Sequence, residues 1–375
     1  MRIAFVHYPG RIARLEAARA GTAPSEFLFG AVELERRGHD VEHFEVDPEM
    51  GGGRAWPAID RFVHRGYLPP HVSGVALEQT RRLLSALTVF DVVVGTTIGT
   101  SLPLAFWRWA GRLDVPLVGI VSGLAEPHKR RSRRALIARL LRQMDTVLYG
   151  EAELAGMLAL DPRLVGRVHV NQFGVDVAYW TPADPPSDGY ILSIGNDGRR
   201  DYATLVRAAS GIPAPVRIVT GHEPPADLPP NVSWQPGDWH RQVLTDDEVR
   251  SLYRAARAVV VPLRNSIRPS GQSVTLQAMA CGRPVVLSDT DGLWSRATMR
   301  DGDNVVLVPA GDAGALARGV NSLLDEPDRG ARLGAAGRAT VVGEATVDHF
   351  ADRMLAVCRS AVERSPEAAP LASGG

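Results

Sequence analysis

Short apolar runs alternate with amphipathic stretches through the first half of the chain. Residues 2–8 (RIAFVHY) and 40–46 (DVEHFEV) are typical of strands, and between them residues 25–38 have the spacing of a helix that ends at Gly38. Further runs at 91–95, 115–121 and 145–150 are continuous apolar segments, which are typical of parallel sheets covered on both faces. The pattern therefore predicts an open, doubly wound α/β domain.

A second alternation of the same kind follows a break. Residues 179–189 (YWTPADPPSDG) contain three prolines and leave no room for a helix or a strand. We expect two doubly wound, Rossmann-like domains that face each other across a cleft, since ligands of open α/β sheets bind at the strand ends. The expected boundaries are an N-terminal domain at 1–182, a linker at 183–189, a second domain at 190–343, a C-terminal helix at 344–364 that packs back toward the first domain, and a disordered tail at 365–375.

Composition narrows the function classes. The chain has 375 residues, of which 45% are hydrophobic, and a formal net charge of zero, so no global field would recruit nucleic acid. The two cysteines, Cys281 and Cys358, build neither a disulfide framework nor a metal cluster. No signal-peptide pattern opens the sequence, and no run reaches the length of a membrane-spanning helix. We therefore expect a soluble, cytoplasmic protein.

The stretch 270–288 (SGQSVTLQAMACGRPVVLS) predicts an anion site. Ser270 and Gly271 would end a loop, and a helix over 272–280 would point its free amides into the cleft. Ser273 and Gln277 are four residues apart and share one helix face. A phosphate would sit on the amides, with Gln277 one turn behind it near a ribose. The simpler alternative is an ordinary surface helix capped by serine.

A pair of arginines supports the phosphate interpretation. Residues 193–205 (SIGNDGRRDYATL) place Arg199 and Arg200 between a strand that ends at Gly195 and a helix capped by Asp201. Two guanidiniums at the end of a strand suit a diphosphate leaving group, because they neutralise the charge that grows as the sugar–phosphate bond breaks. The alternative is a solvated pair beside Asp201.

These motifs together resemble a known family. The order of NQFGVDVAYWTP, YILSIGNDGRRDYATLVRA, NVSWQPGDW, DEVRSLYRAARAVVVPL and SGQSVTLQAMACGRPVVLSDTDG is similar to that of the retaining GT-B glycosyltransferases of family 4. The resemblance implies a GT-B fold and transfer of a sugar from a nucleoside-diphosphate sugar to an acceptor nucleophile, with retention at the anomeric carbon. It implies that no metal or other cofactor is needed, because arginines and helix amides neutralise the leaving group.

The resemblance also assigns roles to positions of this chain. Either Arg199 or Arg200 takes the basic position on the donor diphosphate, and Gln277 stands where the family usually has a glutamate on the ribose. The first of the family's two glutamates falls on Pro269, so contacts that help to define the donor are altered. The remaining implied donor contacts are Gly10 in the first domain, Trp239 in the loop against the base, and Ser270, Gly271, Gln272, Ser273 and Val274 around the diphosphate.

The prediction for the acceptor side depends on one basic segment of the first domain. Residues 129–142 carry Lys129 and a run of arginines at the N-terminal end of a predicted helix, where the helix dipole disfavours cations. This suggests an anionic partner. The partner would be either an anionic group on the acceptor or a phospholipid surface that the protein contacts peripherally at the inner membrane face. The alternative is that these side chains are simply solvated. The acceptor could be a small molecule, a glycan or a lipid-linked sugar. His128 is the candidate catalytic residue beside the reacting sugar.

Two other functions remain compatible with the same fold. One is a GT-B nucleotide-sugar epimerase, which would need no acceptor. The other is a catalytically silent protein that binds a nucleotide sugar, an interpretation that Pro269 and Gln277 favour because they replace the usual glutamates.

Overall fold

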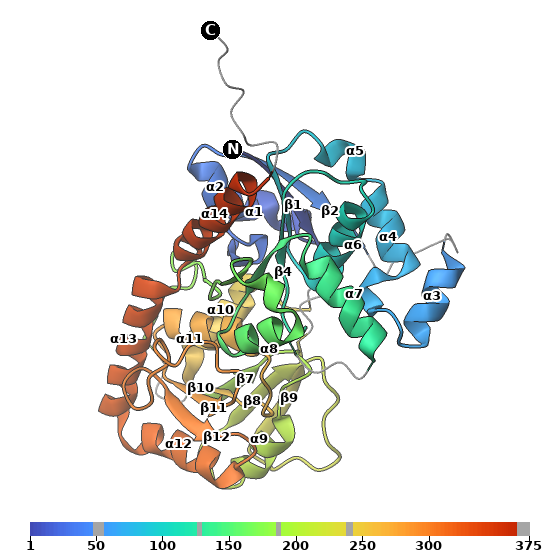
Figure 1. The fold of residues 1–375 in the computed structure, drawn as a ribbon. Coiled ribbons are helices and arrows are strands. Elements are labelled where there is room, and N and C mark those ends of the chain that lie inside the picture. Colours follow the sequence, from blue (N-terminus) through green and yellow to red (C-terminus); the bar gives the residue numbers. More distant parts are fainter. Residues whose placement is uncertain (48–55, 126–129, 185–188, 238–242, 366–375) are drawn as a thin grey trace.

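Two parallel sheets form the framework of the protein. The computed structural model describes residues 1–47, 56–125, 130–184, 189–237 and 243–365. Within these ranges each sheet has six strands, and helices cover both faces (Figure 1). The first sheet contains β1 (Arg2–His7), β2 (Asp40–Glu45), β3 (Val92–Gly95), β4 (Leu117–Ile120), β5 (Asp145–Leu148) and β6 (Val168–Val170). The second contains β7 (Tyr190–Ile194), β8 (Val216–Thr220), β9 (Val232–Pro236), β10 (Ala256–Val261), β11 (Val285–Asp289) and β12 (Val306–Pro309).

Helices connect the strands in both halves. Those of the first half are α1 (Leu15–Arg19), α2 (Ala31–Arg36), α3 (Pro57–His64), α4 (Gly74–Arg81), α5 (Leu84–Leu87), α6 (Ile98–Trp109), α7 (Arg131–Leu141) and α8 (Ala152–Leu160). Those of the second half are α9 (Tyr202–Ala209), α10 (Asp246–Ala255), α11 (Gln272–Ala280), α12 (Ala313–Asp325), α13 (Pro327–Glu344) and α14 (Val347–Glu363). Short 3-10 segments are η1 (Ile12–Arg14), η2 (Glu26–Leu28), η3 (Pro70–Val72) and η4 (Pro162–Leu164).

The strand order reverses once in each sheet. The first sheet runs β2-β1-β3-β4-β5-β6 and the second β12-β11-β10-β7-β8-β9. The reversal lies between β1 and β3, where Val6 pairs with Gly95, and between β7 and β10, where Leu192 pairs with Val259. Crevices at such reversals, outside the carboxyl ends of the strands, are where open α/β sheets bind ligands. The predicted doubly wound architecture is confirmed.

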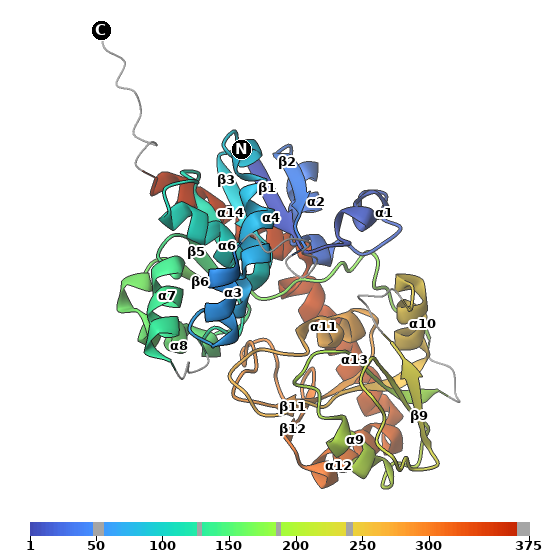
Figure 2. The ribbon, with the colours of Figure 1, turned by 90° about the vertical axis from the view of Figure 1, so that its right-hand side faces the viewer.

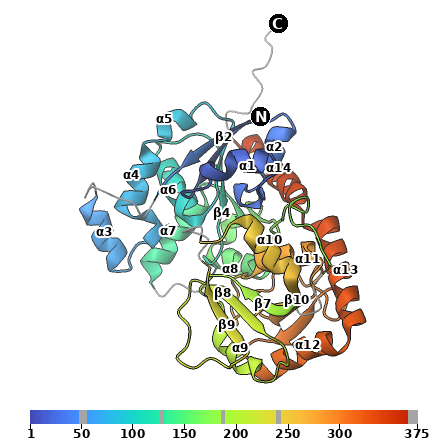
Figure 3. The ribbon, with the colours of Figure 1, turned by 180° about the vertical axis from the view of Figure 1, so that it is seen from behind.

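The end of the chain returns to the first half of the molecule. Helix α13 runs along the second half, and α14 packs on α2 and beside β3 and β4 (Figure 3). Arg37 after α2 bonds Asp348 and Asp352 of α14 at 2.8 and 2.7 Å. One cluster of buried apolar side chains continues from the first sheet through Phe173 and Trp180 to the second sheet. The two halves therefore share a packed interface.

The prediction of one helix over 25–38 is wrong. The structure has η2 and then α2, and between them Phe29 adopts a left-handed φ of 56°, which ends the first segment. The break turns Glu26 into the interface between the two halves, where it is 2% exposed. An apolar pattern cannot report this break, because Phe29 and Leu28 are buried whether or not the helix is continuous.

Candidate functional site

The carboxyl ends of both sheets open into one cleft. Helix α11 lies at the edge of the second half nearest the first (Figure 2). A cavity of about 480 Å³ lies between the halves. It is lined by the loop after β3, the loop after β7 and the start of α11, so both strand-order reversals contribute to it. A volume of this size is typical of small-molecule sites.

The start of α11 matches the predicted bounds of 272–280 and leaves its amides open. Gly271 precedes the helix with a φ of 74°, and within the described residues no side chain caps it. A Cβ at Gly271 would lie 2.7 Å from Cγ1 of Val261, so both the backbone angle and the close approach to β10 require glycine. The amides of Gln272, Ser273 and Val274 belong to the first helical turn and have no partner inside the helix. This end of α11 is therefore suited to an anion.

The side chain of Gln272 has a different role from its amide. Its Nε2 donates to the carbonyl of Tyr149 at 3.0 Å, and its Oε1 accepts from the amide of Phe173 at 3.3 Å. Gln272 thus ties α11 to the first half and aligns the helix start with the cleft.

Arg200 lies beside the same cavity with unused hydrogen-bonding capacity. Its side chain is 2% exposed, and its Nε donates to Oδ2 of Asp197 at 2.7 Å. Its Nη1 is buried and has no partner among the described residues. A Cβ at Gly195 would lie 2.6 Å from Cζ of Arg200, which explains why β7 ends on glycine. A buried donor without a partner costs free energy, so an anion in the cleft would satisfy it.

The structure separates the two candidate arginines. Arg200 lines the cleft cavity of about 480 Å³, whereas Arg199 is half-buried and is not among the residues that line this cavity. The carbonyl of Arg199 instead accepts from the amide of Arg264 at 2.8 Å. The geometry favours Arg200 for the predicted basic position.

An adjoining cavity of about 640 Å³ brings the first-half loop into the same site. Gly10 lines it together with Arg200, Ser273 and Val274. Ser270 and Gly271 line the 480 Å³ cavity next to it. Predicted donor contacts from three separate parts of the chain therefore surround one space. The predicted contacts Arg199, Gln277 and Trp239 are not among them.

Gln277 is held in a buried network between the two halves. Its Oε1 accepts from the hydroxyl of Tyr253 at 3.0 Å, and its Nε2 donates to Oε1 of Glu26 at 2.9 Å. Gln277 is 2% exposed, although it borders a third cavity of about 250 Å³. A ribose hydroxyl would have to share or displace one of these bonds, so the predicted ribose contact stays a prediction.

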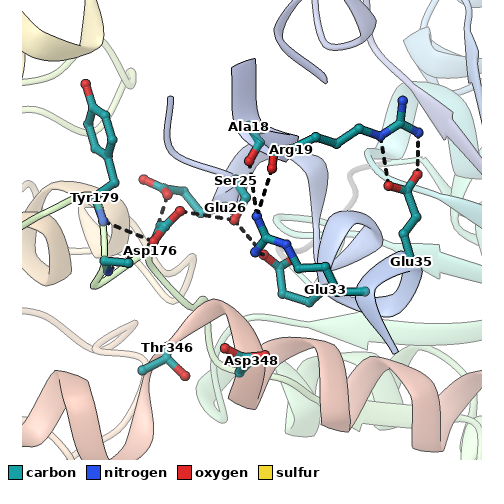
Figure 4. A network of polar contacts seen from close by, with 12 residues as sticks. Ala18, Arg19, Ser25, Glu26, Glu33, Glu35, Asp176, Tyr179, Thr346 and Asp348 are labelled. Atoms are coloured by element: carbon teal, nitrogen blue, oxygen red, sulfur yellow. Dashed lines mark hydrogen bonds and ion pairs between the residues drawn. The ribbon is translucent and has the colours of Figure 1, made fainter. Parts of the chain in front are cut away.

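Glu26 also joins a group of polar contacts with Asp176, Ser25 and Glu33 (Figure 4). Besides Gln277 it accepts from Nε1 of Trp180 at 2.7 Å and from the amide of Asp176 at 3.3 Å. Burial raises the pKa of Glu26 from 4.5 to about 7, against the opposing effect of the bonds from Gln277 and Trp180. Burial also raises the pKa of the neighbouring Glu33, whose Oε1 accepts from Ser25 at 2.6 Å. The sequence did not single out this role, because a glutamate at a helix start is ordinary.

The first-half wall of the cleft carries basic side chains that the sequence did not single out. Arg11 lies over the ring of Phe27 at 4.9 Å, and His71 lines the same cavity. Burial lowers the pKa of both groups. They follow no motif, and only the tertiary fold brings η1 and η3 to the cleft.

Three of the predicted residues lie outside the described residues, namely His128, Lys129 and Trp239. Within the described ranges, no group of three or more His, Cys, Asp or Glu side chains could hold a metal ion. No helix among them is both long and apolar enough to cross a membrane.

Comparisons with known proteins find similarity to glycosyltransferases. Residues 199–326 match the family model for glycosyl transferases group 1. The alpha-maltose-1-phosphate synthase of Mycolicibacterium smegmatis is 32% identical over 232 residues, which is 54% of this chain and 58% of that protein. The chain thus spans little more than half the length of this curated relative.

Two solved structures share the fold over nearly the whole chain. Sucrose-phosphate synthase from Thermosynechococcus elongatus has a TM-score of 0.70 and 20% identity, and covers 96% of this chain and 98% of its own. Anabaena HepE, solved with UDP-glucose, has a TM-score of 0.64 and 16% identity, and covers 96% and 100%. The chain therefore has the GT-B fold of these structures, and residues 199–326 are similar to glycosyl transferases group 1.

Proposed function

We propose that the protein is a retaining glycosyltransferase that moves a sugar from a nucleoside-diphosphate sugar to an acceptor nucleophile. The observation that carries the proposal is the pairing of the uncapped start of α11 with Arg200, whose Nη1 is buried and without a partner among the described residues. Both line the same cleft.

The chemistry follows from these groups. As the bond from the anomeric carbon to the diphosphate breaks, negative charge grows on the diphosphate oxygens. Preorganised amides and a guanidinium stabilise that charge without rearrangement. The protein therefore contributes mainly positioning and electrostatics, and the leaving diphosphate itself helps to deprotonate the acceptor on the same face, which gives retention. In this proposal neither a metal nor another cofactor takes part.

Product analysis tests the proposal. The protein is incubated with UDP-, GDP-, ADP- and TDP-sugars and a panel of acceptors. The relative from M. smegmatis is named for a product that carries a phosphate, so the panel includes phosphorylated sugars. We expect acceptor-dependent release of nucleoside diphosphate and an α-linked product from an α-linked donor, read by NMR of the anomeric proton. A β-linked product would contradict retention.

A silent donor-binding protein is the second candidate. It is favoured by Pro269 and Gln277, which leave the α11 site without the family's two carboxylates, and by the engagement of both ends of the Gln277 amide. Tight binding of one nucleoside diphosphate with no turnover of its sugars by any acceptor would support this candidate. Release of an isomerised sugar without an acceptor would instead indicate an epimerase.

We also propose that the protein is cytoplasmic and that it binds peripherally to a membrane through the exposed part of α7. Arg131 and Arg134 are exposed there, and Arg139 lies over the ring of Trp109 at 5.1 Å. Anionic headgroups attract such basic segments. Salt-sensitive co-sedimentation with phosphatidylserine vesicles, lost in Arg131→Gln/Arg134→Gln, is the expected result; equal recovery with neutral vesicles would contradict it.

A further inference from the structure

One guanidinium on the first-half wall of the cleft has no role in the site as described so far. Arg11 lies between the loop after β1 and the start of η1. It lines both the 480 Å³ and the 640 Å³ cavity, and among the described arginines only Arg11 and Arg200 line both. Arg200 follows β7 in the second half, so the two guanidiniums border one space from different halves of the molecule.

An aromatic side chain supports Arg11 at the cleft. Cζ of Arg11 lies 4.9 Å from the centre of the Phe27 ring. Phe27 belongs to η2 and packs on Phe173, with 5.9 Å between the ring centres, and both rings line the 480 Å³ cavity. Contact with the face of a ring uses none of the N–H groups of a guanidinium, so these groups stay available to an acceptor in the cleft.

The charge of Arg11 is not matched by an acid. In the described part of the chain, no carboxylate forms an ion pair or a hydrogen bond with it. Of the acids that act on Arg11 from further away, Glu45 accepts from the amide of Ile12 at 2.6 Å. The other, Asp246, pairs with Arg14.

Burial makes this unmatched charge unfavourable. It lowers the pKa of Arg11, and the positive charge of Arg14 lowers it further. A guanidinium nevertheless keeps its charge at neutral pH. An anion in the cleft would therefore stabilise a cation that the protein itself leaves unbalanced.

The charges around the two cavities point to the donor diphosphate as this anion. Among the described residues Asp197 is the one carboxylate that lines either cavity, and it already pairs with Arg200 at 2.7 Å. A diphosphate ester carries a negative charge on each phosphate. The second half offers it Arg200, whereas Arg199 does not line these cavities. A second guanidinium for the diphosphate has to come from the first half.

We propose that Arg11 binds the donor diphosphate together with Arg200, so that one guanidinium from each half holds the leaving group. This rests on the proposed glycosyltransferase function and adds to it a residue that no motif of the sequence marks. As the bond from the anomeric carbon to the diphosphate breaks, its electron pair stays on the diphosphate oxygen. The acceptor bonds to the anomeric carbon and gives its proton to the leaving diphosphate. Because negative charge grows on the diphosphate, Arg11 stabilises the departing group more than the intact donor.

Calorimetry with three ligands of one base tests this inference. The base is the one whose nucleoside diphosphate, among UDP, GDP, ADP and TDP, binds the wild type most tightly. The ligands are its nucleoside, its nucleoside diphosphate and the glucose ester of that diphosphate, with displacement titration for a weak ligand. In Arg11→Gln the nucleoside diphosphate should bind about 10-fold more weakly, the scale of a hydrogen bond to a charged group. The nucleoside should stay within about 2-fold, because it carries no phosphate.

The third ligand and turnover test the role in the reaction. The wild type should prefer the free nucleoside diphosphate over its glucose ester, and Arg11→Gln should reduce that preference, since the free diphosphate carries more negative charge. With a donor and an acceptor that turn over, Arg11→Gln should lower kcat and not only raise KM.

Two further variants separate charge from packing. Arg11→Lys keeps the charge without the forked geometry, so it should recover part of the lost affinity. Arg2→Gln is the matched control, because Arg2 also belongs to the first half and lies over an aromatic ring, that of Phe90, at 5.5 Å. Arg2 lines neither cleft cavity, so all three affinities should stay within about 2-fold of the wild type.

Two results would overturn the inference and leave the proposed function intact. One is a nucleoside diphosphate whose affinity falls in Arg200→Ala and stays unchanged in Arg11→Gln. The other is an equal loss of nucleoside and nucleoside diphosphate affinity in Arg11→Gln, which would mean that Arg11 only shapes its loop. If none of the four nucleoside diphosphates binds the wild type, the proposed function fails and this inference fails with it.

Discussion

Two helices begin at the cleft, one from each half, and they differ in how their first turns are satisfied. Helix α6 follows Thr97, whose carbonyl accepts from the first-turn amide of Thr100 at 3.2 Å and whose own amide donates to the hydroxyl of Thr100 at 3.1 Å. Helix α11 follows Gly271, which offers no side chain to its own amides. Both starts line the 480 Å³ cavity. Amides of the first turn are open only where the chain does not cap itself, so we assign the donor diphosphate to α11 rather than to α6.

The cations near the two starts differ as well. Arg200 stands beside α11 with its charge partly matched by Asp197 at 2.7 Å. The basic side chains on the α6 side are His71 and Arg11, whose pKa values are both lowered by burial. A fixed, oriented guanidinium suits a leaving group that is always the same, whereas the other wall also has to accept whichever molecule receives the sugar.

The largest effect is expected at the glycine that opens α11. Gly271→Ala would strain a left-handed residue and press a methyl group against Val261, so the free energy of unfolding should fall by about 2–4 kcal/mol. Binding of the nucleoside diphosphate should be lost as well, because the amides would move. Chemical denaturation and calorimetry measure the two effects.

Gly302 offers a matched control for that substitution. Its φ is 73°, almost the same as that of Gly271, but a Cβ there would meet nothing within 4 Å. Gly302→Ala should therefore cost only the backbone strain, about 1–2 kcal/mol, and leave binding unchanged. Equal losses from both substitutions would show that the close approach to Val261 has no importance.

Arg200 is the next largest test of the α11 site. Arg200→Ala should weaken nucleoside diphosphate binding by about 1.5–3 kcal/mol, which is roughly 10- to 150-fold. Arg199→Ala should change the dissociation constant by less than about 2-fold, because Arg199 lines neither cleft cavity. A larger loss from Arg199→Ala than from Arg200→Ala would exchange the two assignments.

Glu26 tests how α11 is coupled to the first half. The folded pKa of about 7 lies above the ordinary 4.5, so the folded state binds more protons than the unfolded state between these values. The contribution of Glu26 to stability is thus fully present below pH 4.5 and is lost as the pH rises to about 7.

Glu26→Gln removes this titration and keeps an acceptor for Trp180 and Gln277. Relative to the wild type, the variant should gain up to about 3 kcal/mol in its free energy of unfolding between pH 4.5 and 7. Urea denaturation at several pH values measures the difference. A difference that is constant with pH would mean that Glu26 does not titrate in this range.

The smallest effect is expected at the capped helix. Thr100→Val removes the hydroxyl that accepts from the amide of Thr97, so it should cost about 1 kcal/mol of stability. Nucleoside diphosphate affinity, followed by calorimetry, should not change. A clear loss of affinity would show that the start of α6 also holds the donor, and the contrast between the two helices would be lost.

Local patterns predicted the framework of the site well. Continuous apolar runs and glycine-ended strands indicated two doubly wound halves, and the serine–glycine turn before residue 272 marked the start of α11. These features depend on neighbours in sequence. The arginine pair was recognised for the same reason, but which of the two faces the cleft depends on how Arg200 packs over Gly195.

The remaining parts of the site depend on contacts between distant segments. Glu26 and Gln277 are 251 positions apart, and no local pattern links them. His71 and Arg268 line one cavity from opposite halves, and only the relative placement of the two sheets brings them to it. The left-handed Phe29, which turns Glu26 inward, replaces a helix that periodicity alone would continue.

The most direct test of the central claim is a thermal-shift comparison of the wild type and Arg200→Ala with UDP, GDP, ADP and TDP. A ligand that binds only the folded state raises the melting temperature. We predict a clear rise with at least one of the four for the wild type and a much smaller rise for Arg200→Ala. Equal rises in both proteins, or no rise with any nucleoside diphosphate, would contradict a diphosphate site at Arg200 and α11.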